Sequence, residues 1–98
     1  MKQNKVDHKT LHVKAEIKDN LTQRDLEAFG AVLASEGTVS LSQKRGANVR
    51  AAIQAGWFKE LQPAMTVEQV AEQSPVVIRL LADWIDEIYD EVTTIPPE

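Results

Sequence analysis

The segment SPVVIRLLADWIDEIYDEV, residues 74–92, carries the clearest helical pattern in the chain. Ser74 is a residue type that caps helices, and Pro75 suits a first turn, where its missing N–H costs nothing. At about 100° per residue, the large apolar side chains fall within one arc of roughly 180°. These side chains are Val77, Ile78, Leu80, Leu81, Trp84, Ile85, Ile88, Tyr89 and Val92. Because a helix that lies on a single neighbour needs an arc of only about 100°, this one is predicted to pack between several elements or to keep part of its arc for a partner.

The opposite side of this helix is acidic, and we expect it to be hydrated without performing a reaction. Its carboxylates are Asp83, Asp86, Glu87, Asp90 and Glu91. Carboxylates spaced i,i+4 can bind a hard cation, but no histidine lies nearby and no loop supplies backbone carbonyls. We therefore expect no metal site and no cofactor. Acidic groups near the carboxyl end of a helix oppose its dipole, a cost that a basic partner would offset.

Two longer helices and one short helix are predicted before this segment. Thr22 with Asp25 resembles a capping box that opens a helix within residues 19–37, and Gly37 suits its end. Ser40 with Gln43, or Ser42 alone, can cap a second helix within residues 40–58. Its small residues Ala47, Ala51, Ala52 and Ala55 would let another helix approach closely. The short helix begins after Thr66, and Pro96 and Pro97 cannot continue the last one.

Residues 11–18, LHVKAEIK, alternate apolar and polar side chains, which is typical of a strand with one buried face. A lone strand cannot satisfy its backbone hydrogen-bonding groups, so it needs a second strand. Residues 37–41, GTVSL, are the candidate within the chain; otherwise another copy or another protein supplies it. The predicted fold is therefore mainly α, or small α+β: a compact four-helix domain with a short N-terminal strand, or with a two-stranded pairing. We expect residues 1–9 to be flexible, residues 10–95 to form one globular domain and residues 96–98 to form a tail.

The composition limits the possible functions. There is no cysteine, which excludes disulfides, thiolate metal sites and cysteine nucleophiles. The polar N-terminus has no apolar stretch typical of a signal peptide, and no run approaches the roughly 20 apolar residues of a membrane span. We therefore expect a cytoplasmic protein, in the host cytoplasm if it is viral. The net charge of −4 is uneven, because residues 66–98 hold eight acidic groups against Arg79 alone. This split favours self-contact or an electropositive partner, although it also suits a solubilising surface.

Chemistry has little support in the sequence. Asp7, His8 and His12 could suggest a metal cluster, but in a strand the two histidines would lie about 13 Å apart. A serine nucleophile would need a histidine base, and both histidines lie near the N-terminus. There is no glycine-rich phosphate loop. An enzyme is not expected.

Three stretches carry a resemblance to a known class of proteins. A short strand leads into LTQRDLEAF (21–29), followed by AAIQAGWF (51–58) and then VAEQSPVVIRLLADWIDEIYDEV (70–92), and the chain closes on IPPE (95–98). In this order and pattern, residues 11–98 resemble small proteins encoded among the head and tail genes of long-tailed bacteriophages, including tail assembly chaperones. The resemblance implies a non-enzymatic, mostly helical assembly factor that contacts a structural partner, and it assigns no functional residue.

We therefore favour protein–protein interaction as the function, in an adaptor or assembly factor such as a phage head or tail assembly protein. Its partner is expected to be another protein or a second copy of the chain, with no membrane involved. Trp84 is expected in the core, with the edge of the helix near Trp84 and Tyr89 open to a partner. The full set of candidate partner contacts is Trp57, Phe58, Asp83, Trp84, Asp86, Glu87, Tyr89 and Asp90.

Two alternatives remain open from the sequence. One is an acidic anti-defence inhibitor whose carboxylates mimic nucleic acid. The other is a small DNA-binding protein that uses a helix at residues 42–56, since QKRGANVR is similar to the start of a recognition helix. Its candidate DNA contacts are Lys44, Arg45, Asn48 and Arg50. The acidic charge of the chain argues against this second alternative, because binding to duplex DNA relies on a basic face.

Overall fold

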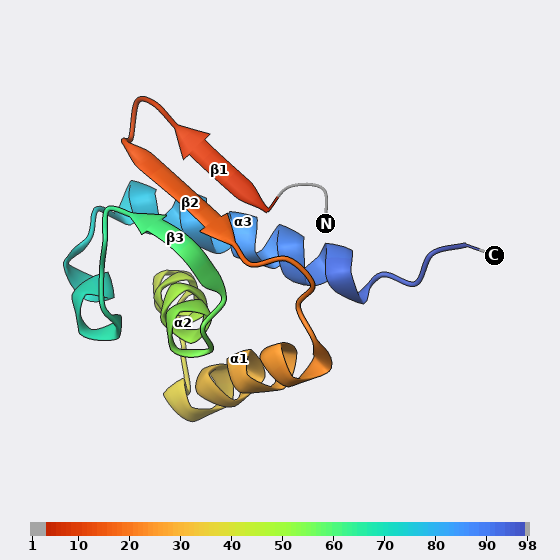
Figure 1. Ribbon diagram of the computed structural model, residues 1–98. Coiled ribbons are helices and arrows are strands. Elements are labelled where there is room, and N and C mark those ends of the chain that lie inside the picture. The colour runs from red at the N-terminus through yellow and green to blue at the C-terminus, as the bar shows by residue number, and fades with distance from the viewer. Residues whose placement is uncertain (1–3, 98) are drawn as a thin grey trace.

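The computed structural model describes residues 4–97 of the chain. Three strands form one antiparallel sheet in the order β1-β2-β3, and three α-helices and a 3-10 helix pack beside it. In chain order the elements are β1 (Lys5–His8), β2 (Val13–Ile17), α1 (Gln23–Glu36), α2 (Leu41–Gln54), β3 (Phe58–Gln62), η1 (Val67–Glu72) and α3 (Pro75–Thr93). Figure 1 shows the sheet lying against α3, with α2 next and α1 on the far side of α2. No helix within residues 4–97 has both the length and the apolar composition needed to cross a membrane.

The predicted fold class is wrong, because the domain is an α+β fold with a three-stranded antiparallel sheet, not a four-helix domain with one short strand or a two-stranded pairing. The strand expected within residues 11–18 is present as β2, and its alternate residues Val13, Ala15 and Ile17 are buried as predicted. Its partners differ from the expected one. Residues 37–40 form the loop between α1 and α2, and the sheet is completed by β1 and β3.

Both partner strands have weak sequence signals for physical reasons. β1 lies within residues 1–9, where we expected a flexible segment, and Val6 is its only apolar residue because an edge strand buries little. β3 occupies residues where we expected the second helix to end and a connection to begin. A register shift opposite Glu16 and Ile17 places Phe58 and Leu61, three positions apart, against core residues of β2. This irregularity removes the period of two that identifies a strand. Residues 1–3 and 98 of the expected terminal segments lie outside the described residues.

The helix starts predicted at Thr22 and Ser40 are confirmed by their hydrogen bonds, whereas Ser74, which was predicted to cap the last helix, makes no side-chain capping hydrogen bond at the start of α3. Thr22 and Asp25 form a reciprocal capping box at the start of α1, and Gly37 ends that helix in the left-handed region at φ 57°. Ser40 and Gln43 form a second capping box at the start of α2. The short helix after Thr66 is present as the 3-10 helix η1. These local signals depend on neighbouring residues alone, which explains why they can be identified in the sequence.

Trp57 joins the start of β3 to α1. Its side chain is fully buried, and its Nε1–H donates a hydrogen bond of 3.0 Å to the backbone oxygen of Asp25. Its rings stack on Phe29, with 4.5 Å between ring centroids. A buried indole whose N–H has a partner combines a large apolar contact with a satisfied polar group. The contact therefore fixes where α1 lies relative to the sheet.

α2 is the central helix and packs against both α1 and α3. Small residues on α2, namely Gly46, Ala47, Ala51 and Ala52, are buried and allow its neighbours to approach closely. The apolar face of α3 lies between α2 and the sheet. On this face, the ring centroid of Trp84 lies 6.4 Å from the ring centroid of Phe58 in β3. The wide apolar arc predicted for residues 74–92 is thus covered from two directions.

Replacing Trp84 by Ala is expected to lower the free energy of unfolding by about 3–5 kcal/mol, because the side chain is buried and a cavity would remain. Trp84 is 6% exposed, whereas Val76 on the same helix is 55% exposed. Val76→Ala is therefore the matched control and should change the free energy of unfolding by less than about 0.5 kcal/mol. Urea denaturation followed by fluorescence of Trp57 measures both variants. Equal losses would contradict a core position for Trp84.

Gly30→Ala is expected to stabilise the protein by about 1 kcal/mol, because Gly30 lies inside α1 and Ala is the better helix former. A Cβ atom at Gly30 would meet nothing within 4 Å, so no steric cost offsets this gain. Gly37→Ala is the opposite control, since Gly37 has a φ of 57° that an L-residue adopts at a cost of about 1 kcal/mol. Thermal unfolding of the two variants should therefore shift in opposite directions.

Candidate functional site

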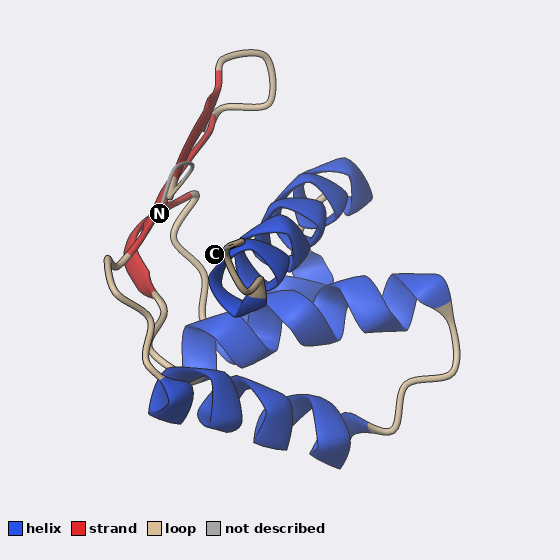
Figure 2. Cartoon of the chain, turned by 90° about the vertical axis from the view of Figure 1, so that its right-hand side faces the viewer, coloured by secondary structure: helices blue, strands red, loops and turns tan. Residues whose placement is uncertain are grey.

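An open groove runs between α1 and α3, with α2 as its floor. It consists of two adjoining cavities of about 320 Å³ and 210 Å³, which share Leu33, Asn48 and Asp86. Figure 2 shows α2 lying between α1 and α3. Leu33 belongs to α1, Asn48 to α2 and Asp86 to α3, so each of the three helices contributes to the centre of the groove.

α3 contributes one wall of the groove through Asp83, Asp86 and Tyr89. These residues are spaced three apart and therefore share one face of the helix. The Asn48 side-chain amide donates a hydrogen bond of 2.9 Å to the Asp86 carboxylate and so ties this wall to the floor. Tyr89 is 39% exposed, and its ring contacts the buried ring of Phe29 at a centroid distance of 5.8 Å. Tyr89 is thus the one predicted aromatic contact that combines a fixed position with an open face.

The surroundings of Asp86 disfavour the ionised form of its carboxyl group. Its partial burial raises the pKa of its carboxyl above the ordinary value, the neighbouring charge of Asp83 raises it further, and the hydrogen bond from Asn48 lowers it. Asp83 itself lies 3.8 Å from Arg79. Among residues 4–97 no ion pair involves Asp86, so its charge has no cationic partner in this part of the chain. A cation brought by a partner would supply what Asp86 lacks.

The end of the groove next to the α1–α2 loop is basic and apolar. Leu41, Lys44 and Arg45 line it together with Thr38. Lys44 is exposed, while Arg45 is half-buried, and the Arg45 Nε atom is buried without a hydrogen-bond partner among residues 4–97. The groove therefore carries positive charge at this end and negative charge along the α3 wall, with apolar surface between.

Arg50 has a structural partner. Its guanidinium binds the Glu36 carboxylate through Nε at 2.8 Å and Nη2 at 2.7 Å, which joins α2 to the last turn of α1. This hydrogen bonding holds the pKa of Glu36 below its ordinary value and raises the pKa of Arg50. Of the four residues considered for DNA contact, Arg50 and Asn48 are thus engaged by carboxylates of the protein, while Lys44 and Arg45 have no carboxylate partner within residues 4–97.

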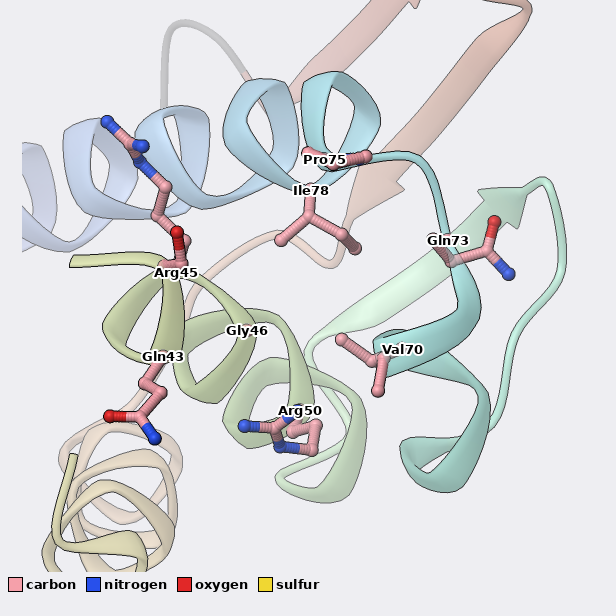
Figure 3. Close-up of a pocket in the computed structure, with 10 residues that line it drawn as sticks. Gln43, Arg45, Gly46, Arg50, Val70, Gln73, Pro75 and Ile78 are labelled. Carbon is pink, nitrogen blue, oxygen red and sulfur yellow. The ribbon is translucent and has the colours of Figure 1, made fainter. Parts of the chain in front are cut away.

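A separate cavity of about 340 Å³ lies between α2, η1 and the start of α3. Figure 3 shows Val70 and Ile78 facing this cavity from η1 and α3, while the guanidinium of Arg45 lies over α3. Arg50 also lines it, but its charge is already paired with Glu36. The cavity is therefore mainly an apolar depression, and its other charged lining residue is Arg45, which also lines the groove.

The remaining predicted contacts are divided between core and surface. Trp57 is fully buried and Trp84 is 6% exposed, so neither indole is presented to a partner. Phe58 is half-buried beside Trp84, whereas Glu87 and Asp90 are exposed. The structure thus brings together Asp83, Asp86 and Tyr89 with Lys44, Arg45 and Asn48, residues that the sequence had assigned to separate hypotheses.

The sequence analysis did not identify α1 as a wall of the groove. Phe29, Gly30 and Leu33 line it from α1. Gly30 is the residue that could have indicated this wall from the sequence. A glycine inside an exposed helix lowers stability by about 1 kcal/mol relative to Ala, so its presence there needs an explanation. That explanation is not internal packing, since a Cβ atom there would meet nothing within 4 Å.

Both histidines lie at the turn between β1 and β2. The Nδ1 atom of His8 accepts a hydrogen bond of 3.1 Å from the backbone N–H of Leu11, and His12 has a positive φ of 55°. Asp7 is paired with Lys9 at 2.9 Å. Within the described part of the chain, no group of three or more metal-ligating side chains is placed to hold an ion.

A scan against protein-family models, a search of curated proteins and a search of solved structures each found no match for this chain. The function of the groove is therefore inferred from its own residues.

Asp86→Asn is expected to raise the free energy of unfolding at neutral pH and to have little effect at about pH 3. The folded protein raises the pKa of Asp86, so ionisation of this group favours the unfolded chain, and stability is lost as pH rises past its ordinary value of 3.8. The amide retains an acceptor for Asn48 and removes the charge. Urea denaturation at the two pH values measures the difference.

Glu36→Gln provides the control of opposite sign. The pKa of Glu36 is lowered from 4.5, so its stabilising contribution is present above that value and is lost as pH falls through the folded pKa. Glu36→Gln should therefore destabilise the protein at neutral pH and approach the wild type in acid. If Asp86→Asn also destabilised the protein at neutral pH, the unfavourable setting of Asp86 would be contradicted.

Proposed function

We propose that the protein is a non-enzymatic protein-binding module, an adaptor or assembly factor, that takes a segment of its partner into the α1–α3 groove. The observation that carries this proposal is that one open groove combines apolar surface with charged groups of both signs that have no ion-pair partner within residues 4–97. Such a surface offers an apolar contact area together with charges that orient the bound segment.

The chemistry of the groove specifies the kind of segment that it takes. Leu33, Leu41 and Tyr89 provide apolar contacts, so the segment needs apolar side chains. Asp86, with Asp90 one turn further along α3, favours a cation on the same segment. Gly30 leaves the α1 wall low, so the backbone of the segment can approach closely. The expected ligand is therefore an apolar segment that carries a lysine or arginine.

DNA binding through α2 receives less support from the same geometry. Asn48 and Arg50 are engaged by Asp86 and Glu36. Asp83 and Asp86 line the cavity beside Lys44 and Arg45, where they would repel phosphate. The resemblance of residues 11–98 to proteins of phage head and tail assembly suggests the setting that we propose, in which the groove binds a structural protein during assembly.

Selection from a library of displayed random peptides tests the groove as a binding site. We expect the wild-type protein, immobilised at low density, to enrich peptides that combine apolar residues with Lys or Arg. Gly30→Trp should abolish their binding, because Gly30 lines the groove and the added ring would occupy it. Ala31→Trp is the matched control, since Ala31 is exposed on the same helix about 100° away from Gly30.

Binding that Ala31→Trp retains and Gly30→Trp loses would support the proposal. Selected peptides that bind the two variants equally well would contradict it, because they would occupy another surface. Circular dichroism of both variants verifies that the added tryptophan leaves the fold intact.

A further inference from the structure

The corner between α1 and α2 exposes two apolar side chains beside the groove. Val39 is 87% exposed and Leu41 is 61% exposed. Val39 lies in the loop and Leu41 is the first residue of α2, so both are fixed by the capping box of Ser40 and Gln43. Exposed apolar groups at a well-ordered turn are costly to hydrate and favour a contact that covers them.

The same corner carries a cation. Lys44 lies one turn after Leu41 on α2, shares its face and is exposed. Residues 39–44 of this chain thus have the composition that the groove requires: apolar side chains followed by a lysine. Within one molecule this corner cannot enter the far end of the groove, because it forms the near end of that groove itself.

The far end of the groove is complementary to this corner. Phe29, Gly30, Leu33 and Tyr89 line an open cavity of about 210 Å³ there. Asp90 follows Tyr89, is exposed, and lies one turn after Asp86 on α3. If Leu41 of another copy entered this cavity, its Lys44, one turn further along α2, would come to lie near the carboxylates of Asp86 and Asp90.

We propose that a second copy of the chain occupies the groove, with the α1–α2 corner of each copy inserted into the far end of the groove of the other. A surface that carries both the projecting corner and its receptor is self-complementary, as a two-fold symmetric dimer requires. Leu41 of one copy packs beside Tyr89 of the other, and Lys44 pairs with the acidic face at Asp90. This inference rests on the proposed function of the same groove and identifies the partner.

Light scattering over a concentration series tests the pairing directly with the full chain. The mass should rise from 10.9 kDa toward twice that value between about 1 μM and about 1 mM. Leu41→Asp should keep the protein monomeric, because it places a charge in the apolar contact. Val76→Asp is the matched control, since Val76 is also exposed and does not line the groove, and it should dimerise like the wild type.

A charge-reversal pair tests the arrangement of the dimer. Lys44→Glu and Asp90→Lys should each weaken dimerisation by at least about tenfold, because each places like charges opposite one another. An equimolar mixture of the two variants should recover dimerisation, because in the mixed dimer one ion pair is the original Lys44 with Asp90 and the other is restored with reversed sign. Both new charges suit their helices, with Glu near the start of α2 and Lys near the end of α3, so folding should survive.

Three results would overturn the inference. They are a mass of 10.9 kDa throughout the series, a dimer that Leu41→Asp leaves unchanged, and a mixture that dimerises no better than its separate components. The proposed function fails by a different measurement, namely peptides that bind equally to Gly30→Trp and Ala31→Trp. A monomer whose selected peptides are lost only in Gly30→Trp would thus overturn self-pairing and support a different protein partner.

Discussion

The wide apolar face of α3 is the constraint on which the rest of the structure depends. One flat neighbour cannot cover an arc of this width, so the sheet covers one part and α2 covers another. Phe58 contacts Trp84 from the sheet side, and the small residues of α2 allow a close approach from the other side. With α3 held in this position, α1 packs on the far side of α2 and does not reach α3 closely enough to close the space between them.

The groove is a consequence of this layering. α1 is fixed by two long-range contacts, the stacking of Trp57 on Phe29 and the ion pair of Glu36 with Arg50. The stacking holds the middle of α1 beside the start of β3, and the ion pair holds the end of α1 against α2, so neither contact closes the α1–α3 side. Gly30 keeps the α1 wall low, while Asp83, Asp86 and Tyr89 form the facing wall. The open surface is therefore built into a rigid arrangement of helices.

The groove is electrostatically asymmetric. The unpaired carboxylate of Asp86 lies within the same depression as the ammonium of Lys44, yet within the described residues the two form no ion pair. The uneven charge of the sequence thus places acidic groups on one wall of the groove and basic groups at one of its ends. A partner with apolar side chains and a cation would neutralise the acidic wall and cover the apolar floor, which joins the packing and the charge into one binding surface.

The sequence by itself identified the helices and the capping boxes at Thr22 and Ser40, because these depend on local hydrogen bonding. Its periodicity also identified the buried face of β2 and the broad apolar arc of residues 74–92. These features depend on residues within a few positions of one another. Tertiary structure decided the three-stranded sheet, because Val6, the single apolar residue of β1, is only half-buried and the register shift between β2 and β3 hides the alternation of β3. It also decided the site, since Leu33, Asn48 and Asp86 come from three helices, and only the packing of those helices brings their side chains together.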